Sequence, residues 1–350
     1  MPACENTWNR NNRQTRSFRF VRKNSAIDRR TEEKGGQRVA FYFASEKNKR
    51  EINEDSYCQM ELRINLEASI SAMVVADGMG GLAGGKFYSE TALELWYRGL
   101  LDTMMGEGFR DCSLHQQIDA LTEFSENIFE KINRQLYKKG LDTGARGGTT
   151  LSAAIHFWDT WIISNCGDSP VYGMKNGELS LLGEIQNVAS QMVKKGTTKE
   201  GTTLFYQNKN RLTEYLGKRS EVHPCCVRLP QDAVDMILMG SDGAFGNLSL
   251  LEIETFLHER QPSRQMLTEL FELAKASGEE DNQTAILFVG EKNTETELFQ
   301  TDMYQELKLG DAFSDAVLPF GSYTEVPEEK REFSLKDKLL RHRFTGGKDK

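Results

Sequence analysis

Carboxylates recur along this chain at the ends of apolar runs. The segments "AMVVADGMGG", "IISNCGDS" and "DMILMGSDGAFG" each carry an acidic residue behind a run that is typical of a buried strand, and "GEEDNQTAILF" carries one before such a run. The acidic residues are Asp77, Asp168, Asp242 and Asp281, and "KREINEDSY" adds Glu54 and Asp55 before a further expected strand. A buried carboxylate without a partner is costly, so several that converged would need a cation to neutralise them. Oxygen ligands of this kind suit Mg²⁺ or Mn²⁺ and not Zn²⁺, because no His or Cys cluster accompanies them.

The glycine-rich segment behind Asp77 is open to other interpretations. Residues 78–83 satisfy G-x-G-x-x-A after an expected strand, which is typical of a dinucleotide-binding turn, but the helix that follows leads into another helix and not into a parallel strand. Residues 80–86 have the G-x4-G-K spacing of a phosphate loop, but Phe87 stands where that loop needs Ser or Thr. A plain turn between strand and helix is the commonest role of an isolated glycine cluster. The recurrence of strand-end carboxylates favours the metal site.

Composition restricts the class of protein. With 350 residues, of which 38% are hydrophobic and 27% charged, the chain can form one large globular domain with tails or two small domains. The net charge of -8 argues against nucleic acid as the main partner. We find no apolar run near the roughly 18 residues of a membrane span and no signal-peptide pattern. The six cysteines show neither zinc nor disulfide spacing, which indicates reduced thiols and a cytoplasmic location.

Three regions differ in character. Residues 1–36 are polar and basic, with an arginine at every third position from Arg10 to Arg22, and we expect a flexible, solvated arm. An anion-binding arm and an organellar targeting segment are the alternatives. Residues 37–290 contain most of the apolar runs and form the expected folded domain. Residues 291–350 are a charged tail, in which "KREFSLKDKLLRHRF" has the pattern of a short basic amphipathic helix.

Apolar periodicity predicts mixed secondary structure within residues 37–290. Strands are expected over 38–45, 71–77, 148–157, 160–168, 234–243 and 283–290. Helices are expected over 85–101, 113–140, 249–259 and 263–278, and Gly140 is expected to end the second. The short turn between the third and fourth strands is a hairpin signal, which favours antiparallel pairing. These elements indicate an α+β fold in which helices pack on antiparallel sheets.

Seven blocks of the sequence, taken in order, resemble the metal-dependent protein Ser/Thr phosphatases of type 2C in their bacterial form. The blocks are "REINED", "VVADGMGG", "GGTTLSAA", "NCGDSPVYGMKNGELSLL", "NRLTEYLG", "MGSDGAFGNLS" and "EEDNQTAIL". The resemblance covers about residues 37–290. It implies an α+β fold built as a four-layer α-β-β-α sandwich, with two central, mainly antiparallel sheets and a two-metal site at one edge.

The resemblance also implies a set of metal ligands. Asp77 would bridge two metal ions, and the carbonyl of Gly78 would bind one of them. Asp242 and Asp281 would complete the ligand shell of one ion. Glu54 would hold water molecules of the other. The implied ions are Mn²⁺ or Mg²⁺, two per site.

Further positions are implied around these ligands. Asp168, together with Asp242, matches the site of a third, more loosely bound metal ion. Arg50 matches the arginine that grips the substrate phosphate, where a fork of donors suits phosphate oxygens. Supporting positions are Asp55, Thr149, Thr150, Ser169, Gly243 and Asn282.

The implied activity is the hydrolysis of phosphoserine and phosphothreonine monoesters in proteins. A metal-bound water or hydroxide would attack phosphorus, with Arg50 and Asp77 as catalytic residues. The expected partners are phosphorylated proteins, opposite a Ser/Thr kinase, and neither nucleic acid nor a membrane; we expect a cytoplasmic monomer. The alternative is a pseudophosphatase or phosphoprotein-binding sensor that keeps the metal site with little turnover.

Three positions depart from the family pattern. Leu82 stands where bacterial relatives usually carry a histidine that is a proposed general acid, so the proton donor to the leaving group is unassigned. Lys86 replaces a usual glutamate, and Pro170 replaces a usual arginine. The main metal-linked carboxylates are all retained, which favours an active enzyme.

Overall fold

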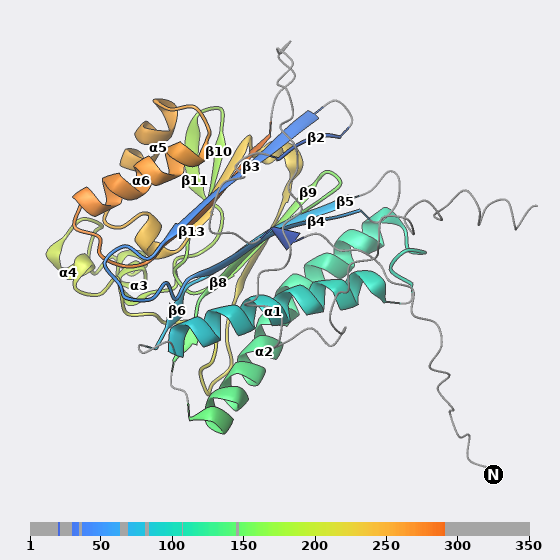
Figure 1. The fold of residues 1–350 in the computed structure, drawn as a ribbon, viewed down its shortest axis with the longest axis horizontal. Coiled ribbons are helices and arrows are strands. Elements are labelled where there is room, and N and C mark those ends of the chain that lie inside the picture. Colours follow the sequence, from blue (N-terminus) through green and yellow to red (C-terminus); the bar gives the residue numbers. More distant parts are fainter. Residues whose placement is uncertain are drawn as a thin grey trace, which may run out of the picture. The chain divides into compact units, whose positions relative to one another are not determined.

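Two six-stranded sheets form the centre of the fold (Figure 1). In this computed structural model the described residues are 20–21, 30–34, 37–63, 69–80, 84–106, 108–144 and 147–290. The first sheet has the order β1-β4-β5-β8-β9-β12, and every neighbouring pair is antiparallel. Its strands are β1 (Phe20–Val21), β4 (Ser56–Arg63), β5 (Ser69–Ala76), β8 (Leu151–Phe157), β9 (Thr160–Cys166) and β12 (Cys225–Pro230).

The second sheet has the order β11-β10-β13-β14-β3-β2 and is also antiparallel throughout. Its strands are β2 (Arg30–Lys34), β3 (Gln37–Glu46), β10 (Val171–Lys175), β11 (Glu178–Leu181), β13 (Met236–Gly240) and β14 (Gln283–Gly290). A separate two-stranded ribbon joins β6 (Gly78–Met79) to β7 (Gly148–Thr149). The predicted hairpin of β8 and β9 is confirmed, with Phe157 opposite Thr160.

Helices cover the outer faces of both sheets (Figure 1). The long helices α1 (Gly84–Met105) and α2 (Leu114–Thr143) pack on the first sheet, and α5 (Leu250–His258) and α6 (Arg264–Ala276) pack on the second. Shorter elements are α3 (Val188–Lys194), α4 (Thr203–Tyr206) and the 3-10 turns η1 (Gln231–Ala233) and η2 (Asp242–Ala244). The four-layer α-β-β-α arrangement expected from the sequence is confirmed.

Capping residues set the ends of α2. Ser113 and Gln116 form a capping box, in which each side chain accepts a hydrogen bond from the backbone N–H of the other. The predicted stop at Gly140 is wrong, because Gly140 is buried inside the helix. The helix ends instead at Gly144, whose φ of 69° is the left-handed conformation that glycine adopts easily.

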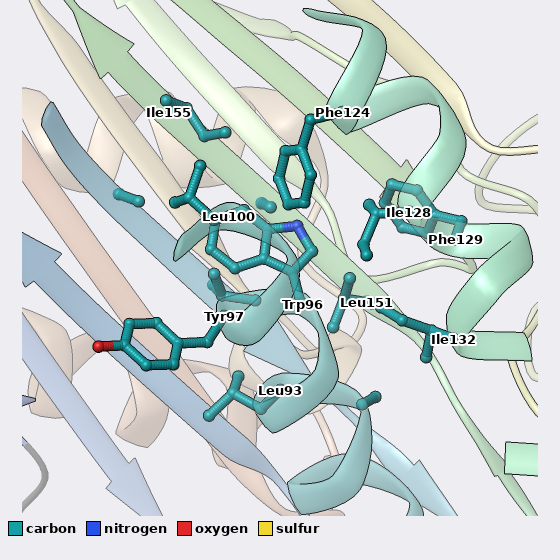
Figure 2. Packing of buried hydrophobic residues seen from close by; sticks show 14 of the residues in the cluster. Leu93, Trp96, Tyr97, Leu100, Phe124, Ile128, Phe129, Ile132, Leu151 and Ile155 are labelled. Carbon is teal, nitrogen blue, oxygen red and sulfur yellow. The ribbon is translucent and has the colours of Figure 1, made fainter. Parts of the chain in front are cut away.

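Three apolar layers make up the core. Between the first sheet and the α1–α2 pair, Trp96 lies edge-on to Phe124 with ring centroids 5.6 Å apart (Figure 2). Between the two sheets, the rings of Trp161 and Phe288 lie 4.8 Å apart. A third layer lies under α5 and α6 and includes Phe271. Because both faces of each sheet are covered, the central strands β5, β8 and β9 are buried along their whole length.

The sheets extend into the segment that the sequence suggested was an arm. Strand β1 pairs with β4, and β2 pairs with β3 over five positions, so both lie before the domain boundary expected at Gln37. The rest of the arm, with its five regularly spaced arginines, and the tail 291–350 with its expected amphipathic helix lie outside the described residues. No helix in the described part of the chain is long and apolar enough to cross a membrane.

Candidate metal centre

Asp77 stands at the end of β5, where a neighbouring strand holds its backbone. Its N–H donates to Thr150 Oγ1 at 3.0 Å, and its carbonyl accepts from the Thr150 N–H at 2.9 Å and from Thr149 Oγ1 at 2.8 Å. Thr150 Oγ1 lies 2.6 Å from Ser169 Oγ, so the segment that follows β9 is hydrogen-bonded to the same threonine. The supporting positions Thr149, Thr150 and Ser169 therefore fix the main chain from which the Asp77 carboxylate projects.

The glycines behind Asp77 allow two backbones to touch. A Cβ on Gly78 would lie 2.2 Å from the Gly85 carbonyl oxygen and 2.7 Å from the Glu54 carbonyl oxygen. A Cβ on Gly85 would lie 2.6 Å from the Gly78 carbonyl and 2.8 Å from the Glu54 carboxyl carbon. No side chain fits at either position, because the clashing atoms are mainly backbone. The glycine-rich segment thus brings the start of α1 against the end of β5 and against Glu54.

Glu54 is held from two directions. Its carboxylate Oε1 accepts the backbone N–H of Gly85 at 2.9 Å, which satisfies an otherwise free donor at the start of α1. Its own N–H donates to Asn282 Oδ1 at 2.8 Å. The Asn282 amide also donates to the carbonyls of Lys47 and Ile52. Asn282 therefore holds the segment that carries Glu54 through three hydrogen bonds.

Asp55, just before β4, and Asp242, just after β13, are linked through Ser241. Asp55 is 2% exposed, and its Oδ2 accepts from Ser241 Oγ at 2.7 Å, whereas its Oδ1 is buried with no hydrogen-bond partner among the described residues. Burial raises the pKa of Asp55 from 3.8 to about 7. Asp242 opens η2 directly after Ser241, and Gly243 follows it with its ideal Cβ position only 2.1 Å from the Asn282 carbonyl oxygen. Ser241 was not singled out from the sequence, although it immediately precedes Asp242.

The carboxylates converge on Asp77. Burial raises the pKa of Asp77 well above its ordinary value, and the charges of Asp55, Asp242, Asp168 and Asp281 raise it further, in that order. Burial and then the charge of Asp281 raise the pKa of Asp242, while a hydrogen bond with Asp77 opposes the rise. Acidic residues from the ends of both sheets therefore lie within electrostatic reach of one another.

Asp168, which follows β9, also belongs to this cluster. It is buried, and burial followed by the charge of Asp242 raises its pKa, while Asn187 and Lys209 lower it. The preceding Gly167 adopts a φ of 115°, and a Cβ there would lie 2.6 Å from the Thr150 methyl carbon. Sequence reasoning did not single out Lys209, because a lysine in a polar loop has no pattern that marks it.

Arg50 and Asp281 form an ion pair at the mouth of the cluster. Arg50 Nη2 lies 2.7 Å from Asp281 Oδ2, and the two side chains are 58% and 40% exposed. Asp281 Oδ1 accepts the backbone N–H of Asn282 at 2.8 Å. The structure therefore brings all the predicted ligands and Arg50 to one edge of the sheets. Leu82 lies outside the described residues.

The donor set fits a hard divalent cation. It consists of carboxylate oxygens and the Gly78 carbonyl, which are the ligands that Mg²⁺ and Mn²⁺ accept. Within the described ranges, no three His, Cys, Asp or Glu side chains already form a metal-binding group. Mg²⁺ usually keeps several water molecules and is bound through one or two carboxylates, so it does not need three acids in direct contact with it. Burial first, and then the charges of the neighbouring acids, raise the pKa of Asp77, and a bound cation would offset both effects.

Comparison with known proteins identifies a family and several similar proteins. The protein phosphatase 2C family model matches residues 48–287. Serine/threonine phosphatase stp of Listeria welshimeri is 26% identical over 218 residues, which cover 61% of this chain and 82% of that protein. Protein phosphatase PhpP of Streptococcus pneumoniae is 26% identical over 233 residues, which cover 65% of this chain and 89% of that protein.

Solved structures show the same fold. Serine/threonine phosphatase Stp1 from Staphylococcus aureus matches with a TM-score of 0.60 and 22% identity, over 77% of this chain and all of that one (100%). The catalytic domain of the phosphatase PstP, solved in complex with two manganese ions, matches with a TM-score of 0.55 and 22% identity, over 72% of this chain and 98% of that one.

Proposed function

Because this chain belongs to the protein phosphatase 2C family and is a serine/threonine phosphatase, we propose that it hydrolyses phosphoserine and phosphothreonine in proteins at a two-metal site. The observation that carries the proposal is the convergence of strand-end carboxylates on Asp77, whose charges act on one another at the same edge of the two sheets. No observation favours the pseudophosphatase alternative, since every implied metal ligand is present.

The residues of the cluster have distinct proposed roles. Asp77, the Gly78 carbonyl, Asp242 and Asp281 would hold two metal ions, and Glu54 would hold water molecules at the same site. Asp168 and Asp242 would hold a third, weaker ion. Mn²⁺ or Mg²⁺, when bound, supplies a nucleophilic water at neutral pH and stabilises the charge that develops on the phosphoryl oxygens. The protein's own contribution is to hold these oxygen donors on two rigid sheets.

Arg50 is the proposed phosphate-binding residue. Its guanidinium is 58% exposed at the edge of the cluster, within reach of solvent and of an incoming phosphate group. A planar fork of N–H donors matches two phosphate oxygens at once, so it orients the ester for in-line attack. The proposed substrates are therefore phosphorylated side chains on the surface of other proteins, opposite a Ser/Thr kinase.

We further propose that the protein acts in the cytoplasm as a monomer. The described cysteines, Cys58, Cys112, Cys166, Cys225 and Cys226, are all free, which supports a reducing compartment.

Phosphate release from a phosphothreonine peptide tests the proposal. Activity should require added Mn²⁺ or Mg²⁺ and vanish in EDTA, and the Asp77→Asn variant should remain inactive with metal present. Full activity of the wild-type protein in EDTA would refute the two-metal mechanism.

A further inference from the structure

Helix α1 carries a lysine in its first turn, where its own backbone favours an acid. The first turn of a helix presents free N–H groups and the positive end of the helix dipole. No acidic residue lies in the first turn of α1, and Lys86 is its third residue. A cation is unfavourable at this end, so contacts outside the helix must hold it there.

Lys86 reaches across to the segment that enters β4. Its Nζ donates to the Asp55 carbonyl oxygen at 2.6 Å and to Ser56 Oγ at 3.2 Å. The same ammonium lies 3.7 Å from Glu90 Oε1, one turn further along α1. Its side chain is 27% exposed, so these contacts are partly shielded from water. The shortest contact is therefore with a main-chain carbonyl and not with the carboxylate of Glu90.

A second residue of α1 holds the preceding peptide. Ser89 is fully buried, and its Oγ donates to the Glu54 carbonyl oxygen at 2.5 Å. Ser89 Oγ also lies 2.9 Å from Ser56 Oγ. The Glu54 carbonyl belongs to the peptide on the N-terminal side of the Asp55 Cα, and the Asp55 carbonyl belongs to the peptide on its C-terminal side. Helix α1 thus anchors both peptide planes that flank Asp55.

Anchoring both planes fixes the direction of the Asp55 Cα–Cβ bond, from which the carboxylate projects. The backbone has only two soft dihedral angles at each residue, and they are set once the two flanking peptides are held. The Asp55 carboxylate then accepts the hydroxyl of Ser241 at 2.7 Å, and its charge acts on Asp77. A shift of the Asp55 carbonyl would move this carboxylate relative to Asp77.

We propose that Lys86 is a positioning residue that, with Ser89, holds Asp55 in place beside Asp77 for metal binding. The inference rests on the proposed two-metal function. Lys86 acts through the Asp55 carbonyl and touches neither substrate nor metal. The lysine that replaces the family's usual glutamate is then part of how this chain builds its metal centre.

Mn²⁺ binding by calorimetry on the full chain tests this role. Lys86→Met should weaken Mn²⁺ affinity by about 10-fold, the lower range for loss of a residue that supports a metal ligand. Removing a positive charge near a cation site would by itself tighten binding, so the sign separates positioning from simple electrostatics. Lys86→Arg should restore most of the affinity, because a long cationic donor can reach the same carbonyl.

Glu90→Gln is the matched control. It removes the charged partner of Lys86 but leaves the contact with Asp55, and it should leave Mn²⁺ affinity unchanged. If Lys86→Met does not fold, Lys86→Gln should give the same loss of affinity, because the glutamine side chain is shorter and its amide does not reach the Asp55 carbonyl as the lysine does. Thermal melts accompany each titration to show that the variants are folded.

The outcomes separate this inference from the proposed function. The positioning role is overturned if folded Lys86→Met or Lys86→Gln binds Mn²⁺ as tightly as the wild-type protein, or more tightly. The two-metal proposal is unaffected by that result. An equal loss in Glu90→Gln also overturns the positioning role, because the ion pair would then be responsible. A wild-type protein that binds no Mn²⁺ overturns the proposed metal site and this inference with it.

Discussion

Replacing Arg50 with alanine should change metal binding and substrate binding in opposite directions. The Arg50 guanidinium lies 2.7 Å from the carboxylate of Asp281, which is a proposed metal ligand. A guanidinium and a metal ion that share one carboxylate compete for it. Arg50→Ala should therefore free Asp281 for the cation and at the same time remove the fork that binds the phosphate.

The size of the metal effect follows from the exposure of the pair. The two side chains are 58% and 40% exposed, so water screens their attraction. Exposed ion pairs contribute about 0.2–1 kcal/mol, which corresponds to roughly 1.4- to 5-fold in a dissociation constant. We therefore expect the Kd for Mn²⁺ to fall by that factor, while KM for a phosphothreonine peptide rises and kcat changes less.

Calorimetry with Mn²⁺ and peptide kinetics at saturating Mn²⁺ measure the two effects. Lys49→Ala is the control. Lys49 pairs with Glu280 at 2.7 Å, so this substitution removes a positive charge without changing the contact with Asp281. Mn²⁺ affinity that stays the same or weakens in Arg50→Ala would refute the competition, as would an equal tightening in Lys49→Ala. An unchanged KM would refute the role of Arg50 in phosphate binding.

Other perturbations should have equally distinct results. Asp77→Asn and Asp242→Asn should each nearly abolish turnover with Mn²⁺ and raise the melting temperature of the metal-free protein, because like-charge repulsion is relieved; a lower melting temperature would contradict this. The metal-free protein should lose stability as pH rises from about 4 to about 7, because the pKa of Asp55 is raised from 3.8 to about 7 and the folded state therefore holds a proton that the unfolded state has lost. Thermal melts in EDTA should show the loss and saturating Mn²⁺ should remove most of it; a melting temperature that rises over this range in EDTA would count against the buried acids. Leu82→His should raise phosphopeptide turnover by up to roughly 10²-fold and change p-nitrophenyl phosphate hydrolysis far less, since a good leaving group needs little protonation. Equal gains on both substrates would argue against a general-acid role at that position.

Much of the site could be predicted because its residues follow strong local patterns. A buried antiparallel strand has a nearly continuous apolar run, so the acid that ends it, such as Asp77 or Asp242, stands out in the sequence. The hairpin of β8 and β9 was equally visible from its short turn. The prediction that these acids lie at one edge of the sheets rested on their recurrence and on the order of the seven blocks.

The remaining features depend on contacts between distant segments. Nothing near Gly78 reveals that Gly85 will lie against it, since the close approach depends on where α1 starts in space. Strands β1 and β2 were not predicted, because the two residues of β1 are too short a run to show a period and the five residues of β2 are polar and charged. Gly140 is a residue type that often ends a helix. Only the structure shows that Gly140 is buried inside α2 and that Gly144 has the left-handed conformation that ends it.

The acids of the proposed metal centre come from separate sheets that face each other across an apolar layer. Asp77 and Asp168 follow strands of the first sheet, whereas Asp242 and Asp281 flank strands of the second. Hydrophobic contacts between the sheets are non-directional, so they resist separation but resist sliding less well. A cation bound to acids of both sheets would act as a cross-link at one edge and set their register. Metal depletion would then loosen the alignment of the whole sandwich from that edge, and the phosphate-binding geometry would be lost before the fold itself.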